Sequence, residues 1–447
     1  MENRYLIIKP NGDLVDPKIY MDSLECDPEF KVMIQREALG IGVSNDVSEA
    51  SDYQKYAKKL GFKWEDKVSI GFLQYNYKAD LIMRLVKEYS RKLVNELDLP
   101  IYEVKGSNFF DLEHPVVRSY AQLFGDRLFI QKNGDESMVM SYDASYPQFN
   151  IASNSQLSHK NMPFAHFSVS DCYRYEQSGE CMLLYRSRRF FMPDLHPYLR
   201  DLEEAFKYYF KIEEKLIEAI AMANRQYWNL IKVSSQKNWD DYKDEIIKIA
   251  VNRGVPALVE IKMDNEDRYW IIDVDYSIID SFSQVREICC IQIDVGNAKR
   301  LDIKYVDQND IEQYPVIIHA AVPGGIERFI YMMLDNYKQS FPLWLHPVQV
   351  RIVPVSDKHH DAVDQFVDSC RDIPIRIEID DRSESVAKRI KMAHEDLVSE
   401  VLVFGDKEAD DPGQARQKVF NVAREIEDYP FIKLSWPKHL SRQIKQA

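Results

Sequence analysis

The stretch that decides the fold runs from Cys172 to Arg200 and reads CYRYEQSGECMLLYRSRRFFMPDLHPYLR. Alternating polar and bulky residues on both sides of its Ser-Gly pair predict two antiparallel strands joined by a loop. On such strands Arg174 and Glu176 face one way, and so do Arg186 and Arg188. For an arbitrary hairpin we would prefer a solvated cationic face. Here an Asp-x-His follows the arginines closely, and this concentration of arginine, carboxylate and imidazole side chains favours a functional site.

Upstream of the hairpin, apolar residues recur at three- and four-residue spacing from about Asp80 to Leu97 and predict an amphipathic helix. The strand-like sequence LPIYEV follows at residues 99–104. A helix leading into a strand is compatible with core packing and with a dimer interface, and the spacing of its apolar residues does not distinguish between the two. Residues 116–170 have the pattern of short strands and turns, and residues 1–60 read as a small structural extension.

Downstream, the pattern predicts a long helix from about His196 to Leu230 and then four strands separated by turn residues. The expected strands are 257–263, 269–275, 288–294 and 314–319. An apolar helix begins behind the double glycine at 324–325. Strands that follow one another, with helices grouped rather than interleaved, indicate an α+β fold in which helices flank an antiparallel sheet.

The rhythm changes after residues 342–347, which read as a linker. Strands and helices alternate from Val348 to Phe404 and predict a small α/β domain with a mostly parallel sheet. We therefore divide the chain into an extension (1–60), a large domain (61–340) and a C-terminal domain (345–447). A single core stops growing near roughly 250–300 residues, so a chain of 447 residues has room for two or three cores.

The composition excludes several classes of protein. The chain is 45% hydrophobic and 12% aromatic, as folded domains are. It has no apolar run near the ~20 residues that span a bilayer and no signal-peptide layout at its start, so we expect a cytoplasmic protein without a membrane partner. Six cysteines form no C-x-x-C pair. A net charge of −14 argues against general coating of nucleic acid, although the basic stretches 388–391 and 438–445 are either local contact surfaces or solvated helix faces.

Several charged and ligating side chains are expected to meet around the hairpin. The arginines suit phosphate because a guanidinium binds anionic oxygens bidentately, and two imidazoles with nearby carboxylates could hold a zinc ion. Taken singly, one histidine could cap a helix, the other could be a satisfied core histidine, and a double glycine before a helix is a weak phosphate signal. The set comprises Arg174, Glu176, Arg186, Asp194, His196, His319 and Arg328.

Two segments of the chain resemble known motifs. RYEQSGE with RSRRFFMPDLH resembles motif 2 of the class II aminoacyl-tRNA synthetases, and PGGIERFIYMML resembles their motif 3. MPDLH, CCIQIDVGNAKRLDIKYVD, YPVIIHAA and PLWLHPVQVRIVPVS resemble the threonyl-tRNA synthetases, nearest the archaeal kind. The resemblance covers about residues 75–408. It implies a homodimeric threonine–tRNA ligase that forms threonyl-adenylate from threonine and ATP and transfers threonine to tRNA(Thr). Residues 61–340 would be the catalytic domain and 345–447 the anticodon-binding domain.

The resemblance also implies the residues that bind ATP. Arg174 would hold the ATP α-phosphate and the amino-acid carboxylate, and Arg328 would hold the bent triphosphate tail, so both are expected to be catalytic. Fixed arginines with Mg²⁺ would stabilise the charge that builds on the phosphoryl oxygens. The remaining ATP contacts are Glu176 at the adenine, Arg186 near the γ-phosphate, Phe190 stacked on the base, and Glu287 where many relatives outside the archaea have a glutamine.

For the amino-acid pocket, the resemblance implies Asp194 and Gln292, with His196 and His319 as two of three zinc ligands. Zinc that binds the threonine amine and hydroxyl would reject valine, which cannot coordinate it. Ser145 occupies the position at which the family supplies its third ligand, a cysteine. Because a neutral hydroxyl is a poorer ligand than a thiolate, we expect weaker zinc binding or another donor, for which Cys172 and Cys181 are candidates.

The archaeal family usually begins with a domain that hydrolyses mischarged seryl-tRNA, and we expect the short N-terminal stretch not to contain it. One missing methyl is worth only about 1–3 kcal/mol, so serine should leak through and be cleared by a separate trans-editing protein. Two alternatives stay open: a synthetase-like tRNA-binding or regulatory protein with impaired threonine activation, and an adenylate-forming ligase for another small amino acid. The arginines and histidines favour catalysis, whereas Ser145 favours the alternatives.

Overall fold

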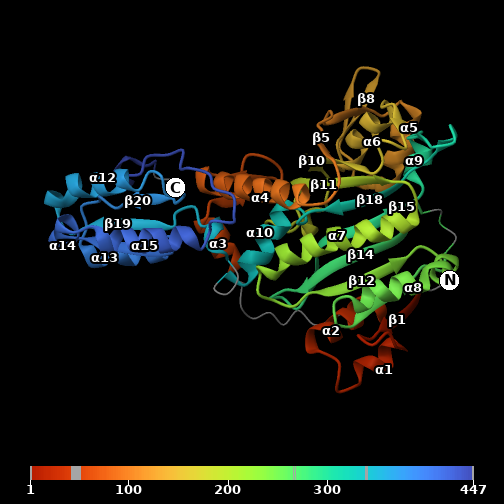
Figure 1. Cartoon of the computed structure of the whole chain (residues 1–447), viewed down its shortest axis with the longest axis horizontal. Helices are drawn as coiled ribbons and strands as arrows, with labels where there is room; N and C mark the ends of the chain where they lie inside the picture. The colour runs from red at the N-terminus through yellow and green to blue at the C-terminus, as the bar shows by residue number, and fades with distance from the viewer. Residues whose placement is uncertain (1–2, 42–51, 265, 267, 338–340, 445–447) are drawn as a thin grey trace. The chain divides into compact units, whose positions relative to one another are not determined.

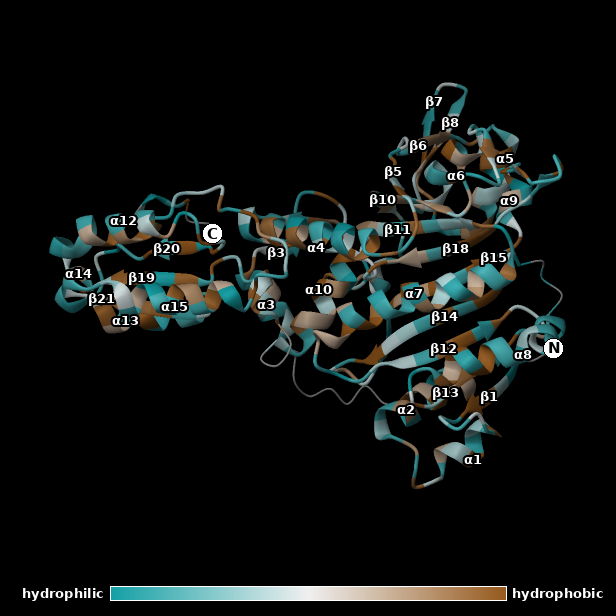
Figure 2. Cartoon of the chain, in the orientation of Figure 1, coloured by the Kyte–Doolittle hydropathy of each residue, from teal (hydrophilic) through white to brown (hydrophobic). Residues whose placement is uncertain are grey.

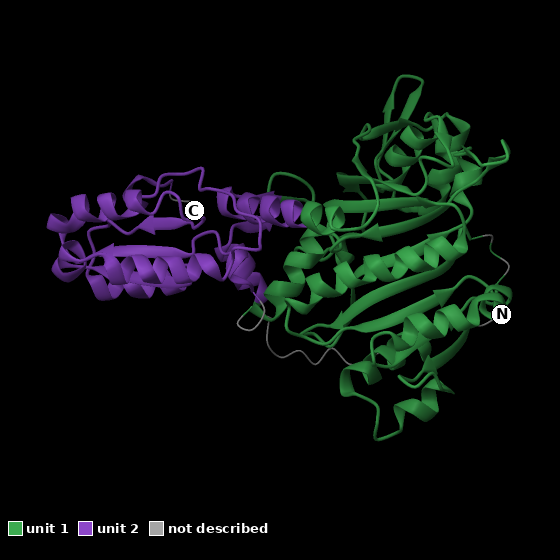
Figure 3. Cartoon of the chain, in the orientation of Figure 1, with its two compact units in different colours: residues 1–52, 65–73, 90–340 green, residues 53–64, 74–89, 341–447 purple. Residues whose placement is uncertain are grey.

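The computed structural model describes residues 3–41, 52–264, 266, 268–337 and 341–444. The chain divides into two compact units (Figure 3). Unit 1 comprises residues 1–52, 65–73 and 90–340, and unit 2 comprises residues 53–64, 74–89 and 341–447. Unit 2 therefore combines the C-terminal part of the chain with two segments from its first ninety residues.

Unit 1 is built on a ten-stranded sheet in the order β2-β1-β13-β12-β14-β15-β18-β11-β10-β5 (Figure 1). Neighbouring strands run antiparallel except for β12 with β13 and β5 with β10, so the predicted α+β class with an antiparallel sheet is confirmed. The strands are β1 (Arg4–Ile8), β2 (Leu14–Val15), β5 (Ile101–Glu103), β10 (Phe164–Tyr173), β11 (Arg189–Leu199), β12 (Trp228–Val233), β13 (Ala257–Ile261), β14 (Trp270–Ile279), β15 (Val285–Asp294) and β18 (Val316–Ala321).

The predicted hairpin is formed by β10 and β11, which pair antiparallel from Phe164 opposite Tyr198 to Tyr173 opposite Arg189. Its predicted strand bounds are wrong, because residues 174–188 form the connection, and this connection contains the four residues expected on the strands, Arg174, Glu176, Arg186 and Arg188. The helix predicted from His196 is wrong at its start, because β11 continues to Leu199. Pro197 disfavours the helical region for the residue before it, and α7 (Leu202–Ala221) begins only behind Asp201, whose side chain accepts from Glu204 N at 2.8 Å. The end of the predicted helix is also wrong, because β12 occupies it.

One face of the sheet is covered by α7 and α8 (Gln236–Val251), and both helices carry hydrophobic and hydrophilic stripes (Figures 1 and 2). The hydroxyls of Tyr209 on α7 and Tyr276 on β14 lie 2.8 Å apart, so the face of β14 that carries Tyr276 points toward α7. Because side chains alternate along a strand, Asp273 and Asp275 point to the opposite face. Helix α10 (Ile326–Asp335) packs against β11 and β15.

A second hydrophobic core in unit 1 lies under residues that were expected to be short strands and turns. That expectation holds for the three-stranded sheet β6-β8-β7 but is wrong for two helices, α5 and α6. Tyr142, Tyr146 and Phe149 are buried in this core together with Tyr198 of β11. The core thereby holds α6 against the hairpin. The elements are α5 (Pro115–Ala121), α6 (Ser145–Ser153), β6 (Phe109–Asp111), β7 (Ile130–Asn133), β8 (Glu136–Met140), β9 (Leu157–Ser158), α9 (Asn297–Arg300), β16 (Tyr305–Val306) and β17 (Glu312–Gln313).

The N-terminal residues add to the edge of the large sheet, because β1 pairs antiparallel with β13 from Arg4 opposite Ile261 to Ile8 opposite Ala257. Two short helices, α1 (Pro17–Met21) and α2 (Pro28–Met33), follow β2 and bury Tyr20, Phe30 and Met33 in the same core as Trp228. Residues 3–41 therefore extend the large sheet and its core, whereas residues 53–60 of the predicted extension belong to unit 2.

Unit 2 contains a parallel sheet in the order β20-β19-β21, as the alternating rhythm predicted. Residues 343–345, expected to belong to a linker, are instead a 3-10 turn with Trp344 and Leu345 buried. Among the described residues, no helix is both long and apolar enough to cross a membrane. The elements are α3 (Tyr53–Lys59), β3 (Phe62–Trp64), β4 (Leu73–Tyr75), α4 (Tyr77–Asn95), whose last turns belong to unit 1, β19 (Val350–Pro354), α12 (His360–Ser369), β20 (Ile377–Ile379), α13 (Val386–Glu395), β21 (Glu400–Phe404), α14 (Asp406–Asp410) and α15 (Gly413–Arg424).

Candidate active site

A row of polar side chains crosses the face of the sheet that points away from α7. The register pairs Lys232 of β12 with Asp273 of β14, Asp273 with Gln292 of β15, and Gln292 with His319 of β18. The Nζ atom of Lys232 lies 3.4 Å from Asp273 Oδ2 and 2.6 Å from Asp275 Oδ2. Strand pairing therefore gathers polar groups from four strands on one face, where apolar residues would be expected if a helix covered it.

The row ends at a pair of buried imidazoles. His196 Nε2 on β11 lies 3.2 Å from His319 Nδ1, and the hydroxyl oxygen of Ser145 on α6 lies 3.0 Å from His196 Nε2 and 3.4 Å from His319 Nδ1. Three donor atoms from a helix and two strands thus face one another around a common point.

The outer nitrogen of each imidazole has a partner that sets its tautomer. His319 Nε2 lies 2.7 Å from Asp294 Oδ2, and His196 Nδ1 lies 2.9 Å from the side-chain oxygen of Gln148. The amide nitrogen of Gln148 donates to Ser168 Oγ at 2.8 Å, which leaves its oxygen to accept from His196. Both outer nitrogens therefore carry the proton when the rings are neutral, and two lone pairs face each other 3.2 Å apart. A proton or a metal ion between the nitrogens would satisfy this pair, and the Ser145 hydroxyl can donate to His196 Nε2 at 3.0 Å.

A carboxylate stands beside this pair. Asp194 Oδ2 accepts from Ser145 Oγ at 3.3 Å and lies 3.5 Å from His196 Nε2. Burial raises the pKa of Asp194 to about 7, although the nearby His319 opposes the rise. Burial lowers the pKa of His196 well below its usual value. Burial alone would lower the pKa of His319 too, but its hydrogen bond to Asp294 raises it. The pocket therefore holds one neutral imidazole beside one that is stabilised as a cation.

Arg174, the residue directly after β10, lies between two aromatic rings. The guanidinium carbon of Arg174 is 5.2 Å from the centroid of Phe190 and 5.5 Å from that of Phe124. Its Nε donates to the carbonyl of Tyr142 at 3.0 Å. In the part of the chain that the structure describes, this is the one hydrogen bond of its side chain, and the two terminal nitrogens stay available for an anion.

Glu176 and Arg186 form a looser pair on the hairpin loop. Arg186 Nη1 lies 3.6 Å from Glu176 Oε2 and 3.5 Å from Glu180 Oε1, too far for a hydrogen bond. Glu176 is buried, and its Oε2 has no hydrogen-bond partner among the described residues. The backbone carbonyl of Glu176 accepts from Arg188 Nε at 2.9 Å, which fixes the loop. A buried acceptor without a donor is costly, and a ligand with an amino group would satisfy it.

Arg328 on α10 is held by β15 and by the hairpin loop. Its Nη1 lies 3.0 Å from Glu287 Oε1, and its Nε donates to the carbonyl of Tyr185 at 3.3 Å. Burial alone would raise the pKa of Glu287, but the cationic Arg328 and Lys232 hold it below its usual value. Glu287 therefore stays an anion that orients Arg328.

The structure brings the predicted site residues together on this face in two groups. Asp194, His196 and His319 surround the imidazole pair, and Gln292 neighbours His319 in the register and accepts from the Tyr269 hydroxyl at 3.0 Å. The second group contains the arginines and their partners, Arg174, Phe190, Glu176, Arg186, Glu287 and Arg328.

Sequence reasoning missed Gln148, Asp294, Lys232 and Asp273. Gln148 follows Ser145 by three residues. Had the helix at 145–153 been predicted, its spacing would have placed both side chains on one face. Asp294 lies two positions after Gln292 on the same strand, which was a usable signal. The two cysteines considered as donors lie elsewhere: Cys172 is opposite Phe190, six positions before His196 on β11, and Cys181 lies in the hairpin loop, with Sγ 3.5 Å from the Gln177 carbonyl oxygen.

A zinc ion fits this pocket in position. Zinc–nitrogen distances of about 2.0–2.1 Å in a tetrahedron separate the donors by roughly 3.3 Å, and the three donor atoms here lie 3.0 to 3.4 Å apart. The outer hydrogen bonds to Asp294 and Gln148 orient both imidazoles as metal ligands usually are. The chemistry fits less well: Ser145 supplies a neutral oxygen, and no three His, Cys, Asp or Glu side chains of the described residues could hold a metal.

Family models match both parts of this architecture. The model described as tRNA synthetase class II core domain (G, H, P, S and T) matches residues 127–337, and the model described as anticodon binding domain matches residues 349–427. The first match spans the hairpin, the imidazole pair and α10. The antiparallel sheet with its arginine-lined face is thus the core of a class II aminoacyl-tRNA synthetase, a class of enzymes that uses ATP.

Relatives narrow the class. The threonine–tRNA ligase of Pyrobaculum calidifontis is 35% identical over 98% of this chain and 74% of its own length, and that of Staphylothermus marinus is 35% identical over 99% and 75%. The chain belongs to the threonine–tRNA ligase family, and its activity is that of a threonine–tRNA ligase with threonine and tRNA(Thr) as substrates.

A solved structure supports the fold alone. The RNA binding domain of threonyl-tRNA synthetase from Cryptosporidium parvum superimposes with a TM-score of 0.72 at 16% identity, over 86% of this chain and 99% of that chain. The predicted family and function are confirmed, and the two alternatives kept open in the sequence are not needed.

Proposed function

We propose that the open face of the sheet forms threonyl-adenylate, with Arg174 and Arg328 as its catalytic residues. The observation that carries the proposal is Arg174, whose two terminal nitrogens have no hydrogen-bond partner among the described residues. A guanidinium in this state suits the α-phosphate of ATP together with the threonine carboxylate. As that carboxylate attacks the α-phosphorus and pyrophosphate leaves, Arg174 stabilises the negative charge on the phosphoryl oxygens.

The remaining ATP contacts follow from the second group of residues. Glu176 accepts from the adenine amino group with its free oxygen, and Phe190 stacks on the base once Arg174 turns toward the phosphates. Arg186, whose guanidinium lies 3.5 Å or more from its acidic neighbours among the described residues, binds the γ-phosphate. Glu287 fixes Arg328 for the triphosphate tail. Mg²⁺ would arrive with ATP and supply charge neutralisation at the phosphates.

For the amino acid, Asp194 binds the threonine ammonium and Gln292 lines the pocket. A zinc ion would be held by His196 Nε2, His319 Nδ1 and the hydroxyl of Ser145, and it would supply direct coordination of the threonine amine and hydroxyl. The facing lone pairs support this assignment, and the neutral oxygen of Ser145 predicts weak retention of zinc.

The division of labour along the chain is part of the proposal. We assign residues 61–340 to catalysis, 345–447 to anticodon binding and 1–60 to a structural extension, except that residues 53–64 and 74–89 fold with the C-terminal unit. A homodimer is supported by β5, which ends the ten-stranded sheet and carries Tyr102 with 57% of its surface exposed. Sedimentation of the full chain with and without Tyr102→Asp tests the dimer, because a charge on that edge would yield monomers.

Binding alone discriminates too weakly between threonine and serine. Serine lacks one methyl, worth about 1–3 kcal/mol or roughly 10- to 200-fold, so a trans-editing protein that clears seryl-tRNA belongs to the proposal. We also assign the protein to the cytoplasm, where tRNA charging occurs. Charging of tRNA(Thr) with serine by the purified chain tests the first point, and discrimination far beyond this range would exclude the need for a partner.

The experiment for the site is pyrophosphate exchange scanned over threonine, serine, valine and alanine, with zinc content measured on the same preparation. We expect exchange with threonine, weaker exchange with serine, and none with valine, because a site that binds a hydroxyl rejects analogues without one by roughly 10⁴-fold or more. Absence of exchange with threonine under conditions in which another amino acid supports it would overturn the proposal.

A further inference from the structure

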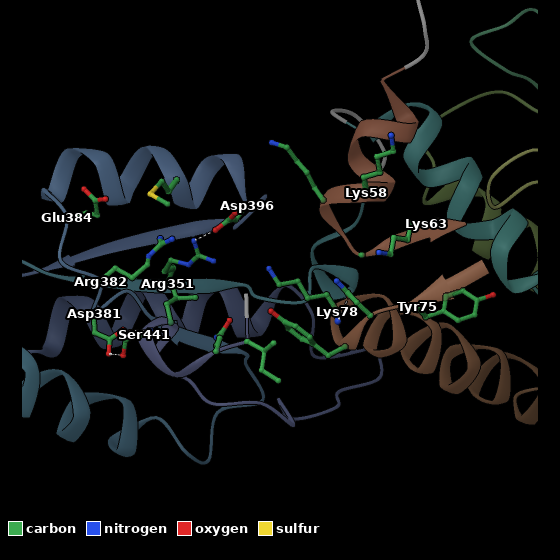
Figure 4. A pocket seen from close by; sticks show the side chains of 18 of the residues that line it. Lys58, Lys63, Tyr75, Lys78, Arg351, Asp381, Arg382, Glu384, Asp396 and Ser441 are labelled. Carbon is green, nitrogen blue, oxygen red and sulfur yellow. Dashed lines mark hydrogen bonds and ion pairs between the residues drawn. The ribbon is translucent and has the colours of Figure 1, made fainter. Parts of the chain in front are cut away.

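Unit 2 contains a large groove that the active site does not use. Its volume is about 1690 Å³, more than the roughly 300–1,000 Å³ typical of small-molecule pockets. One wall comes from α3, the β3–β4 hairpin and the start of α4, and the other from residues 351, 381–384, 392 and 396, with residues 440–444 of the C-terminal tail (Figure 4). Its size favours a macromolecular segment over a metabolite.

The groove is basic in a chain of net charge −14. Six basic side chains line it against three acidic ones. Two of the acidic side chains are already paired with cations: Asp396 lies 2.6 Å from Arg351, and Glu384 lies 2.7 Å from Lys388. The third, Asp381, accepts from the hydroxyl of Ser441 at 2.5 Å. Arg351 and Arg382 are themselves paired with carboxylates, Arg351 with Glu378 and Asp396 and Arg382 with Asp380, so the uncompensated positive charge of the groove comes from its lysines.

Three lysines on one wall supply that charge. Lys58 lies in the last turn of α3, Lys63 lies on β3 and Lys78 lies in the first turn of α4. Lys58 and Lys63 are exposed and Lys78 is partly buried, and within the described residues none of the three has an acidic partner at ion-pair distance. Figure 4 shows the three side chains on the same side of the groove. Unpaired lysines suit phosphate, which they bind as point charges.

The same wall carries aromatic rings, and it is tied to the C-terminal part of the chain. Tyr75 and Tyr77 line the groove, and the ring of Tyr77 lies 4.7 Å from that of Trp436. Lys59 donates to the carbonyl of Glu395 on α13 at 2.6 Å. Lysines interleaved with aromatic side chains are typical of surfaces that follow a nucleic-acid backbone and stack on bases. A partner protein would more often be met by a wall with fewer lysines.

We propose that this groove binds the sugar–phosphate backbone of the anticodon arm of tRNA, and that Lys58, Lys63 and Lys78 contact its phosphates. These lysines lie outside both stretches matched by family models, residues 127–337 and 349–427. The inference rests on the tRNA substrate of the proposed function and adds a binding wall from the first ninety residues of the chain. The remaining acidic surface repels RNA, and the groove is the local exception.

The test compares two triple variants of the full chain. Lys58→Gln, Lys63→Gln and Lys78→Gln remove the charges of the groove. Lys207→Gln, Lys243→Gln and Lys248→Gln remove three exposed charges from α7 and α8 and control for net charge. The affinity for a tRNA(Thr) transcript, an isolated anticodon-arm hairpin and an acceptor-arm hairpin is measured between roughly 50 and 200 mM salt.

For the groove variant we expect affinity for the transcript and for the anticodon hairpin to fall roughly 10- to 100-fold at about 0.1 M salt. The log–log salt slope should fall by about 2, since each phosphate contact contributes roughly 0.7 on single-stranded RNA. Affinity for the acceptor hairpin should not change. Unchanged slopes, or equal losses in both triple variants, would overturn the inference.

Failure of the groove and failure of the active site are told apart by a second measurement. Threonine-dependent pyrophosphate exchange needs no tRNA and reads the site in unit 1, whereas the hairpin affinities read unit 2. If the triple variant melts earlier than the parent protein, Lys58→Gln and Lys63→Gln are measured singly, because both side chains are exposed. Each single variant should lower the slope by about 0.7, and no change in either contradicts the inference.

Discussion

The Nε2 atom of His196 lies 3.2 Å from the Nδ1 atom of His319, and the outer nitrogen of each ring is held by a hydrogen-bond acceptor. The acceptors are Gln148 and Asp294. With both outer nitrogens protonated, two acceptor atoms face each other at hydrogen-bond distance, and Ser145 adds a third oxygen beside them. This arrangement is built for a cation, and its third donor decides how tightly that cation is held.

Ser145→Cys is expected to increase zinc binding. A thiolate replaces a neutral oxygen at 3.0 Å from His196 Nε2, and thiolates are among the strongest zinc ligands in proteins. Zinc per chain after dialysis against a chelator should rise from substoichiometric toward one, while Ser145→Ala should retain less than the parent protein. Equal zinc content in all three proteins would show that Ser145 does not face the metal.

Arg174→Lys is expected to lower kcat/KM for threonine-dependent pyrophosphate exchange by roughly 10²- to 10³-fold, the usual effect of losing one group that stabilises a developing oxyanion. Lysine keeps the charge but cannot bind a phosphate and a carboxylate in parallel. Arg189→Lys is the matched control. Arg189 lies on the same strand pair, faces the other way by the register, and is paired with Asp171 at 2.7 Å. Similar losses in both variants would remove Arg174 from catalysis.

Two substitutions at Glu287 separate charge from orientation. Glu287→Gln keeps an oxygen that can accept from Arg328 Nη1, now 3.0 Å from Oε1, so exchange should stay within about threefold and KM for ATP should not rise. Glu287→Ala releases Arg328, and KM for ATP should rise roughly 10-fold or more. Initial rates over a range of ATP concentrations measure both effects. If the glutamine variant is as impaired as the alanine variant, the negative charge itself is needed.

Much of this site was predictable because its residues lie on neighbouring strands. The sequence predicted the hairpin that carries Arg174 and Phe190, but Arg174 lies in the connection of residues 174–188 between β10 and β11, and the role of Phe190 followed only from the family resemblance. The meeting of Ser145, His196 and His319 was different, because these residues are separated by up to 174 positions and no periodicity relates them. Their proximity followed only from the family resemblance.

The errors have local causes. Residues after His196 are rich in Leu, Phe and Tyr, so the predicted helix began too early, inside β11. The prolines of β11 disfavour helical backbone in the residues that precede them. Residues 53–64 and 74–89 could not be assigned to unit 2 from the sequence. Their apolar residues require a partner surface, but amphipathic spacing does not say which surface supplies it.

Arg351→Met is expected to destabilise unit 2 by about 3–5 kcal/mol, the range found when one member of a buried ion pair is removed. The side chain of Arg351 is fully buried, with Nη2 2.9 Å from Glu378 Oε2 and Nη1 2.6 Å from Asp396 Oδ2. Glu378 is also fully buried, so the substitution leaves a carboxylate without its charge partner. Hydrogen exchange of the β19 and β20 amides, read together with denaturant unfolding, measures the loss.

Two companion variants test whether the loss comes from the unpaired carboxylate. Arg371→Met removes an exposed guanidinium that lies 3.1 Å from Asp368, and such surface pairs contribute about 0–1 kcal/mol, so unit 2 should stay as stable as in the parent protein. Arg351→Met combined with Glu378→Leu removes both buried charges and should recover much of the loss, although Trp436 Nε1 and Gln443 Nε2 then lose their acceptor on Glu378. If the double variant is no more stable than Arg351→Met, the cost lies in lost packing around β19 rather than in the unpaired carboxylate.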